Sequence, residues 1–516
     1  LAMEAPCLYL WGPAGTGKSA TLGFIIANLL RSGQTVLFAS NTHRAVDVGL
    51  LSVLQALDTI GGGPYPERIS RYGDPVLEDE RLAGHAFSVQ VEERKRTRLE
   101  RMAEHVHWLE LAQEYEALGL DSESWDLPAR NFMHHVQAGA YPRDILMVHE
   151  SLERLGGRRQ VEEQVARASQ MNERSEFRSR SLIAATLAKV CTSELFRQRK
   201  FDVVVVDEAS MASLPTLLVL GSHAASRIVV AGDPMQLPPI SAATREESRE
   251  FMEQDVFTFV SGARTPAQLF QWHDRHPGRT AFFEIQYRMR DRLARVISDV
   301  FYEGRLKSAP RGSDPDPDPD DPTPLGARPS PRSALPEHDP RMSPPACHIV
   351  DTSPHGPWIE LDRRDRSFRP VNPVHMTQVA RIVSGLLARG FVEHQIGVIV
   401  PFRHSVYQVS KHLAMDGFRD VETGTIHTFQ GREKDVIIFD TVMSGEKAHA
   451  RAAPRHYTVR PLDETKNTNP IHVPRLLNVA CTRCRRELHI VADMAHIRRR
   501  YGRKFLGKLL QRLSEG

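Results

Sequence analysis

The sequence predicts an α/β fold built on parallel sheets. Short apolar runs of four or five residues recur along the chain, and they are continuous rather than alternating. Continuous runs are typical of strands buried on both faces, as in parallel sheets covered by helices. Polar or glycine-rich residues follow most runs, where open α/β sheets bind their ligands. The runs span residues 36–39, 182–185, 203–206, 228–231, 396–400, 436–439 and 488–491.

The chain is long enough for several compact units. Its 516 residues are 41% hydrophobic and 25% charged, which is an ordinary globular composition, and roughly 100 to 200 residues form one domain. We expect two main domains, residues 1–280 and 281–516. A Glu/Arg-rich stretch at about 88–178 predicts a helical insertion with a solvated surface in the first domain. Residues 310–345 hold 12 of the 34 prolines, which predicts an extended, disordered loop in the second domain.

Composition also excludes several classes of protein. The net charge of +3 gives no overall attraction to a polyanion, so nucleic-acid binding requires a local groove. No apolar run approaches the roughly 18 residues of a membrane span. Five scattered cysteines do not form a disulfide framework, and we expect a soluble cytoplasmic protein with Cys481 and Cys484 in helix packing. Because the chain begins at Leu1, almost directly before a glycine-rich loop, we expect an upstream segment to be missing.

The glycine-rich loop from Gly12 to Ser19 reads Gly-Pro-Ala-Gly-Thr-Gly-Lys-Ser and lies between an apolar run and an apolar helical stretch. This pattern is a P-loop, in which glycines let backbone N–H groups close around phosphates at a helix N-terminus. The sequence therefore predicts a nucleotide site with Gly12, Gly15 and Gly17 in the loop. Lys18 would reach the terminal phosphates, and the Ser19 hydroxyl would ligate Mg²⁺.

A second motif supplies carboxylates to this site. Asp207 and Glu208 directly follow the run of four valines at 203–206. A buried strand that ends in two acids can deliver one carboxylate to a metal and the other to a water molecule. We therefore expect Asp207 to hold Mg²⁺ and Glu208 to act as the base. The alternative is an acidic strand end that caps the next helix.

Further motifs in fixed order narrow the class. Residues 230–239 read Val-Ala-Gly-Asp-Pro-Met-Gln-Leu-Pro-Pro, and residues 286–289 read Gln-Tyr-Arg-Met. Residues 301–306 read Phe-Tyr-Glu-Gly-Arg-Leu, residues 425–433 read Thr-Ile-His-Thr-Phe-Gln-Gly-Arg-Glu, and residues 478–485 read Asn-Val-Ala-Cys-Thr-Arg-Cys-Arg. Together with the P-loop, these motifs resemble those of superfamily 1 helicases. The resemblance is to the Upf-like branch, which includes nonsense-mediated-decay and Dna-type replication helicases.

The resemblance implies two RecA-like P-loop domains in tandem that clamp ATP and Mg²⁺ between them. It implies Arg288 and Arg483 as arginines on the phosphates, and Gln236 and Gln286 as sensors of the γ-phosphate. It places Tyr287 on the adenine, and Thr16 and Gly431 in further contact with the nucleotide. It also implies a set of polar residues that hold the phosphates of a single strand, namely Ser40, Asn41, Thr186 and Thr425. Each serine or threonine among them could instead form a turn or a helix cap.

The function implied is an ATP-dependent helicase or translocase that moves 5′ to 3′ on single-stranded DNA or RNA. Two alternatives stay open: a nucleotide-gated module that grips nucleic acid without moving, and the motor part of a larger nuclease or defence protein. Residues 464–466, Glu-Thr-Lys, are a weak sign of a nuclease site and are better interpreted as a solvated loop. No metal beyond Mg²⁺ is expected. Protein partners could bind through missing flanking domains or the helical insertion.

Overall fold

The computed structural model describes residues 5–61, 68–137, 144–169, 173–241, 243, 245–309, 347–361, 370–445, 462 and 472–515. The expected loop at 310–345 and the triplet at 464–466 lie outside these residues. The chain divides into two compact units. The first unit comprises residues 1–63, 185–192 and 200–516, and the second comprises residues 64–184 and 193–199.

The larger sheet has seven strands in the order β3-β4-β2-β5-β6-β1-β7. The pairs β1–β6, β1–β7, β2–β5 and β5–β6 are parallel, and Ser40 stands opposite Asp207 in the register. The expected runs form these strands, which confirms the α/β class. The strands are β1 (Cys7–Trp11), β2 (Val36–Ser40), β3 (Ile69–Tyr72), β4 (Leu182–Thr186), β5 (Phe201–Asp207), β6 (Ala224–Gly232) and β7 (Thr280–Phe282).

The smaller sheet lies wholly in the first unit and has five parallel strands in the order β10-β16-β15-β13-β14. These are β10 (Cys347–Asp351), β13 (Ile396–Val400), β14 (Glu422–Thr425), β15 (Lys434–Asp440) and β16 (Cys484–Ala492). Two short pairs, β8 (Ile285–Gln286) with β9 (Lys307–Ser308) and β11 (Glu360–Leu361) with β12 (Pro370–Val371), complete the described strands.

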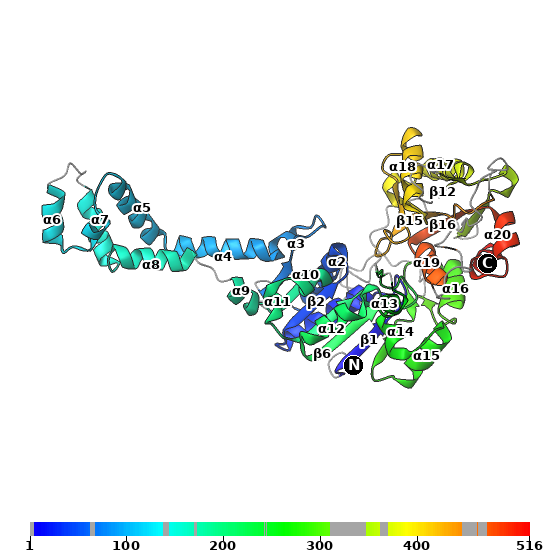
Figure 1. Cartoon of the computed structure of the whole chain (residues 1–516), viewed down its shortest axis with the longest axis horizontal. Coiled ribbons are helices and arrows are strands. Elements are labelled where there is room, and N and C mark those ends of the chain that lie inside the picture. Colours follow the sequence, from blue (N-terminus) through cyan, green and yellow to red (C-terminus); the bar gives the residue numbers. More distant parts are fainter. Residues whose placement is uncertain are drawn as a thin grey trace. The chain divides into compact units, whose positions relative to one another are not determined.

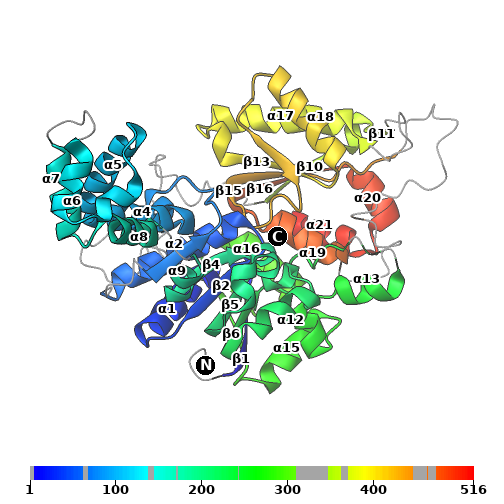
Figure 2. The same ribbon diagram turned by 60° about the vertical axis from the view of Figure 1, so that its left-hand side comes forward.

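Helices of the first unit cover the smaller sheet and the strands of the larger sheet that belong to this unit (Figure 1). In both Figure 1 and Figure 2, α17 and α18 lie on one side of the smaller sheet, and α19 lies on the other. The helices are α1 (Lys18–Arg31), α2 (His43–Thr59), α10 (Leu187–Thr192), α12 (Leu214–Ser222), α13 (Glu246–Met252), α14 (Val256–Ser261), α15 (Pro266–Arg275), α16 (Asp291–Phe301), α17 (Pro373–Ala388), α18 (Arg403–Met415), α19 (His472–Cys481), α20 (Met494–Tyr501) and α21 (Phe505–Glu515).

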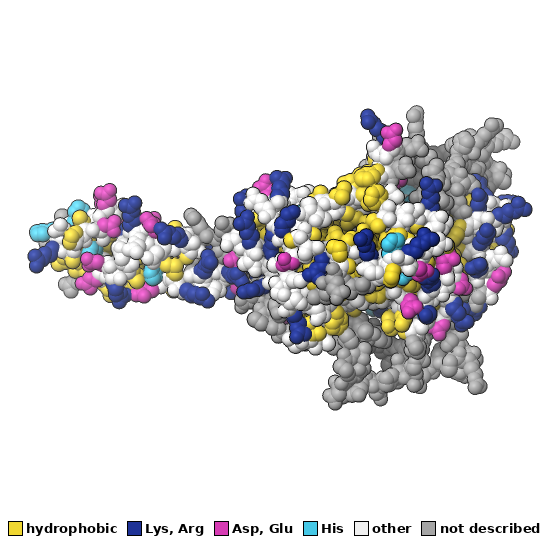
Figure 3. Space-filling model, turned by 90° about the horizontal axis from the view of Figure 1, so that it is seen from below, with side chains coloured by type: hydrophobic (Ala, Val, Ile, Leu, Met, Phe, Trp, Pro, Cys, Tyr) yellow, Lys and Arg dark blue, Asp and Glu magenta, His cyan; other side chains and the backbone are white. Residues whose placement is uncertain are grey.

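The second unit contains the predicted helical insertion. Its helices are α3 (Glu80–His85), α4 (Phe87–Arg101), α5 (Ala103–Ala117), α6 (Ala129–Gln137), α7 (Ile145–Arg154), α8 (Arg158–Ser169), α9 (Glu173–Ser179) and α11 (Glu194–Arg197). An apolar cluster that includes Trp125, Phe132, Val148 and Leu152 forms a core between α5, α6, α7 and α8. Charged side chains of both signs are mixed over much of the surface in Figure 3, and exposed ion pairs such as Arg154 with Glu104 follow this pattern. This is the solvated surface expected for the insertion.

Candidate active site

The P-loop joins β1 to α1, and its glycines are needed for close packing and for backbone angles. Gly15 and Gly17 have φ angles of 79° and 78°, a region that side chains with a Cβ rarely adopt. A Cβ on Gly12 would lie 2.6 Å from the Cβ of Phe283, and one on Gly15 would lie 2.4 Å from the Cβ of Arg288. The loop therefore accepts only glycine where residues 283–288 pack against it.

The start of α1 is open to an anion. Gly17 is the N-cap and provides no side-chain acceptor for the first N–H groups of the helix. Unpaired N–H groups and the helix dipole together favour a phosphate at this point. Lys18 Nζ donates to the carbonyl oxygens of Gly12 at 2.6 Å and Pro13 at 3.1 Å, and the Thr16 hydroxyl donates to Pro13 at 2.8 Å. The lysine ammonium is thus held over the loop, and Ser19 follows it in the first helical turn.

Two carboxylates stand at the end of β5. Asp207 is 5% exposed, and its Oδ1 accepts the backbone N–H of Glu208 at 2.8 Å. Burial raises the pKa of Asp207 to about 7, the Glu208 carboxylate adds to the rise, and the Lys18 ammonium opposes it. Glu208 has a φ of 53°, a strained angle for a residue with a side chain. A carboxylate and the Ser19 hydroxyl are oxygen ligands of the kind that Mg²⁺ prefers, and a bound cation would favour the ionised form of Asp207.

Arg483 reaches this edge of the larger sheet from the smaller one. Its NH2 group donates to Gln236 Oε1 at 2.9 Å, and Gln236 Nε2 donates to Asp233 Oδ2 at 2.8 Å. Burial lowers the pKa of Arg483 to about 10 and nearby Arg288 adds to this, whereas the carboxylates of Glu208 and Asp233 favour its charged form. Burial raises the pKa of Asp233 too, against the opposing effect of Lys18. Residues from both sheets therefore share one electrostatic environment.

Arg288 is the second arginine at this position. It donates to the Thr482 carbonyl oxygen at 3.1 Å and forms an ion pair with Glu433 at 2.5 Å. Burial favours a higher pKa for Glu433, but Arg288 and Arg485 outweigh it and hold that pKa below its usual value. The Arg288 Nε is buried and has no hydrogen-bond partner in the described part of the chain. One face of this guanidinium is thus available to a further acceptor.

The remaining residues assigned to the nucleotide differ in their surroundings. The Gln286 amide is saturated locally: Nε2 donates to Met289 and Ser308, and Oε1 accepts from the N–H groups of Arg288 and Met289. Tyr287 is 61% exposed, and its N–H donates to the Gly15 carbonyl oxygen at 2.8 Å, so its ring stands free next to the P-loop. Gly431 has a φ of 74° and open space where a Cβ would lie.

Comparison with known proteins identifies the family. Two family models, each described as an AAA domain, match residues 2–243 and 267–495. The Regulator of nonsense transcripts 1 homolog of Arabidopsis thaliana is 23% identical over 503 residues, which cover 95% of this chain and 32% of that protein. The DNA replication ATP-dependent helicase/nuclease DNA2 of Xenopus laevis is 27% identical over 296 residues, which cover 55% of this chain and 26% of that protein. The chain belongs to the Upf-like superfamily 1 helicases.

The chain spans about a third of the Arabidopsis relative and about a quarter of the Xenopus one. Among solved structures, the crystal structure of Arterivirus nonstructural protein 10 (helicase) is 11% identical with a TM-score of 0.37. That match covers 95% of this chain and 61% of the viral one. Within the residues that the structure describes, no helix combines the length and apolar character needed to cross a membrane.

The four residues assigned to single-stranded nucleic acid lie in two groups. Ser40 ends β2, Asn41 follows it and Thr186 ends β4, while Thr425 ends β14 in the smaller sheet. Ser40 is fully buried, and the Thr186 hydroxyl accepts the N–H of Lys189 at 3.3 Å. Thr425 Oγ1 accepts the N–H of Thr428 at 3.3 Å. The Thr186 and Thr425 hydroxyls therefore act as local caps, and Asn41 is exposed.

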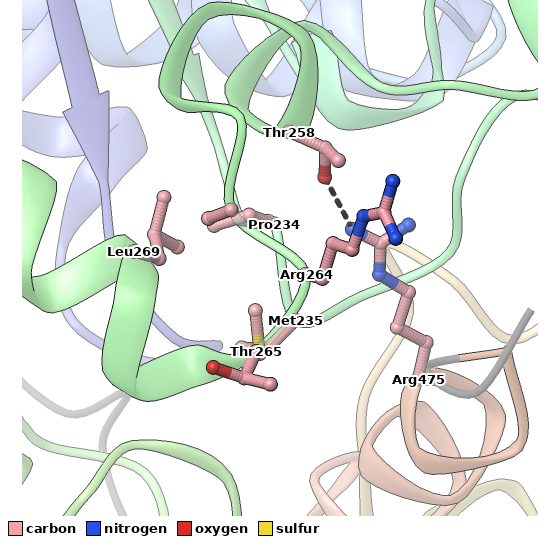
Figure 4. Close-up of a pocket in the computed structure, with 8 residues that line it drawn as sticks. Pro234, Met235, Thr258, Arg264, Thr265, Leu269 and Arg475 are labelled. Atoms are coloured by element: carbon pink, nitrogen blue, oxygen red, sulfur yellow. Dashed lines mark hydrogen bonds between the residues drawn. The ribbon is translucent and has the colours of Figure 1, made fainter.

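Sequence reasoning did not assign roles to three polar residues that the fold brings to the site. Asp233, Tyr302 and Asn478 are all at most 1% exposed and are joined by hydrogen bonds. Each lies inside one of the motifs quoted above, and that location is the sequence feature that could have pointed to a role in the site. A buried ion pair also connects α19 to the segment before α14: Arg475 on α19 pairs with Asp255 at 2.6 Å, and both side chains are at most 3% exposed. Figure 4 shows Arg475 reaching Thr258, close to Pro234 and Met235.

A cluster elsewhere in the first unit has metal-ligand residue types. His348, Glu487 and His489 place one ligand atom each within 4.8 Å of one another. Both oxygens of Glu487 accept from Arg389, at 2.5 and 3.0 Å, and the His489 Nε2 lies 3.2 Å from one of them. The carboxylate is thus already satisfied by a guanidinium, and we interpret the cluster as an ion-pair network that ties α17 to β16. Cys481 and Cys484 are buried free thiols.

Proposed function

We propose that this chain is the ATP-hydrolysing core of a nucleic-acid helicase, which closes two RecA-like domains, residues 1–280 and 281–516, over ATP and moves along a single strand. The observation that carries the proposal is the meeting of residues from two sheets at one nucleotide edge. On the side of the larger sheet, Lys18 begins α1, Asp207 ends β5 and Gln236 follows β6. Arg483, directly before β16 of the smaller sheet, contacts Gln236. An arginine supplied by a second domain is the arrangement that stabilises phosphoryl transfer.

In this proposal each residue has a defined task. The N–H groups of the P-loop and Lys18 bind the phosphates, with Thr16 in the loop and the exposed ring of Tyr287 against the base. Ser19 and Asp207 would hold Mg²⁺, which neutralises phosphate charge as it develops. Glu208 orients the attacking water and accepts its proton.

The arginines and glutamines complete the reaction chemistry. Arg483 and Arg288 donate to the phosphate oxygens as negative charge builds up, with Arg288 exchanging part of its contact with Glu433. Gln236 links Arg483 to Asp233 and thereby reports the γ-phosphate to the strand end of β6. Gln286 supports the site indirectly, because its amide shapes the turn that carries Tyr287 and Arg288. Gly431 leaves room beside the motif that contains Glu433.

The track is a single strand of DNA or RNA, and the direction proposed is 5′ to 3′. Two of the residues assigned to nucleic-acid binding are accessible to solvent: Asn41 after β2 of the larger sheet and Thr425 at the end of β14 in the smaller sheet. A nucleic-acid strand bound to both would be displaced when the domains close. Ser40 and Thr186 would contribute indirectly, because they shape the ends of β2 and β4 beneath the bound nucleic acid.

Steady-state ATP hydrolysis, measured with and without single-stranded DNA and RNA, tests the proposal, with Lys18→Ala as the blank. We expect stimulation by one polymer and its loss in the blank. Hydrolysis that neither polymer changes would reject the motor and favour the nucleotide-gated module. Strand displacement from partial duplexes with either a 5′ or a 3′ tail tests direction, and displacement from 3′ tails alone would overturn the proposed polarity.

A further inference from the structure

Asp233 holds two hydrogen bonds on a single oxygen, and both lead to α19. Its Oδ2 accepts from Gln236 Nε2 at 2.8 Å and from the Tyr302 hydroxyl at 2.8 Å. Gln236 Oε1 then accepts from Arg483 NH2 at 2.9 Å. The Tyr302 oxygen accepts from Asn478 Nδ2 at 2.7 Å. The five side chains therefore form a ring that closes through the chain between Asn478 and Arg483.

The direction of each hydrogen bond in this ring is fixed. Asn478 Nδ2 also donates to the Met235 carbonyl oxygen at 2.8 Å, which a flipped amide could not do. Because Asn478 donates to the tyrosine oxygen, the single hydroxyl proton of Tyr302 is directed to the Asp233 carboxylate. All five side chains are at most 4% exposed. A buried network of this kind has one arrangement in which every bond is made.

The ring grips α19 at two points. Asn478 lies in the last turn of the helix, and Arg483 stands two residues past its end at Cys481. Arg483 is tied back to the helix, since its Nε donates to the Val479 carbonyl oxygen at 3.2 Å. The Thr482 hydroxyl likewise donates to the Asn478 carbonyl oxygen at 2.7 Å. Arg475, nearer the start of α19, holds the helix to Asp255 at 2.6 Å, and the two contacts that meet on the Asp233 carboxylate define how the C-terminal end of the helix is rotated.

We propose that Tyr302 is a positioning residue for ATP hydrolysis: its hydroxyl bridges Asp233 to Asn478, sets the rotation of α19 and so directs the Arg483 guanidinium at the nucleotide. This inference rests on the proposed function, and it assigns Tyr302 no contact with substrate. The bridge makes the strand end of β6 and the helix α19 move as one body. A change at the γ-phosphate that moves Gln236 is thereby transmitted to the smaller sheet at two places instead of one.

The first test is Tyr302→Phe, which keeps the buried ring and removes only the hydroxyl. Asp233 keeps Gln236 and Asn478 keeps the Met235 carbonyl, so we expect a folded protein. The kcat for ATP hydrolysis should fall at least tenfold while KM for ATP changes less than threefold, because the P-loop contacts remain. Tyr501→Phe removes a hydroxyl from another buried tyrosine, on α20, and should leave kcat unchanged. An unchanged kcat in Tyr302→Phe would overturn the proposal.

The second test asks whether Tyr302 acts through Arg483. In an Arg483→Ala background, Tyr302→Phe should lower kcat by less than twofold further, because the group that it directs is gone. A further tenfold loss in the double variant would show that Tyr302 acts by another route, and would overturn the proposal.

A third measurement separates this inference from the proposed function. Amide hydrogen exchange in residues 476–483 should become faster in Tyr302→Phe, whether or not the chain hydrolyses ATP. If the wild-type chain hydrolyses no ATP, the proposed function fails, while faster exchange would still support the hold of Tyr302 on α19. Unchanged exchange in that segment would reject the hold itself.

Discussion

Two regions of the molecule bury side chains of opposite kinds: the first is the contact of Arg483 and α19 with the end of β6 in the first unit, and the second is the helical core of the second unit. In the first, Asp233, Gln236, Asn478 and Arg483 are polar or charged, and each is at most 4% exposed. In the second, the buried cluster is apolar and aromatic, and it includes Trp125 and Phe132. The second unit keeps many of its charges in exposed ion pairs.

This difference separates what each region contributes. Burial of a large apolar side chain stabilises a fold by about 1.5 to 3 kcal/mol, with little dependence on direction. A buried hydrogen-bonded network adds little net stability, yet it specifies where each donor points. We therefore expect substitutions at the contact of Arg483 and α19 with β6 to alter catalysis, and substitutions in the helical core to alter stability alone. The following predictions test this comparison.

The largest effect is expected for Arg483→Ala. Removal of the guanidinium takes away a donor that stabilises the transferring phosphoryl group, and such arginines contribute about 10³ to 10⁵ in rate. ATP binding should change little, because Lys18 and the P-loop are intact. Steady-state hydrolysis and binding of a fluorescent ATP analogue measure the two quantities. Arg154→Ala, an exposed arginine of the second unit, serves as the control, and equal losses in both variants would contradict the prediction.

Glu208→Gln should lower hydrolysis by about 10² to 10⁴, the usual contribution of a general base. The amide keeps the size of the side chain, so ATP and nucleic acid should still bind and the complex should accumulate. Single-turnover hydrolysis with filter binding of labelled ATP checks this outcome. Glu104→Gln makes the same exchange on the surface of the second unit. Wild-type turnover in Glu208→Gln would remove this residue from the role of base.

Phe132→Ala should destabilise the second unit by about 3 to 5 kcal/mol, the usual cost of emptying a buried aromatic site. Phe132 is fully buried, stacks on His149 with ring centroids 4.0 Å apart, and contacts Trp125. Urea unfolding followed by tryptophan fluorescence measures the loss. Hydrolysis per folded molecule should stay at the wild-type level, and a kcat that falls with stability would show that the two regions are not separable.

The smallest effect is expected for the exposed pair of Arg154 and Glu104, whose side chains are 65% and 55% exposed. Surface ion pairs typically contribute about 0 to 1 kcal/mol and are screened by salt. Arg154→Ala should therefore shift the unfolding midpoint only slightly, and less at high salt. A loss comparable to that of Phe132→Ala would mean that charge, not apolar packing, holds this unit together.

Much of the fold was readable from local patterns. Seven apolar runs, among them 203–206 and 436–439, became strands, because continuous apolar residues can be buried only between covering layers. The P-loop was also readable, since Gly15 and Gly17 adopt positive φ angles that few other residues tolerate.

Other features depended on contacts between distant segments. Gln286 looked like a phosphate sensor, but its amide is fully used by its own turn. Ser40 was expected to contact a nucleic-acid strand, but it is buried and stands opposite Asp207 in the register of β2 and β5. A motif names the residue type and its place in the chain, whereas the partner of a polar side chain depends on what the fold brings within hydrogen-bond distance.

The sequence by itself determined the parallel α/β architecture, the helical insertion and the glycine-rich loop, because each follows from residue periodicity or from a short run with special backbone angles. Only the tertiary structure decided that Asp233, Tyr302 and Asn478 form one ring with Gln236 and Arg483. The spacing of these residues along the chain does not reveal where each side chain points or which partner it meets. A hydrogen bond forms only when donor and acceptor meet at about 3 Å and in line, and packing of whole sheets and helices sets that geometry.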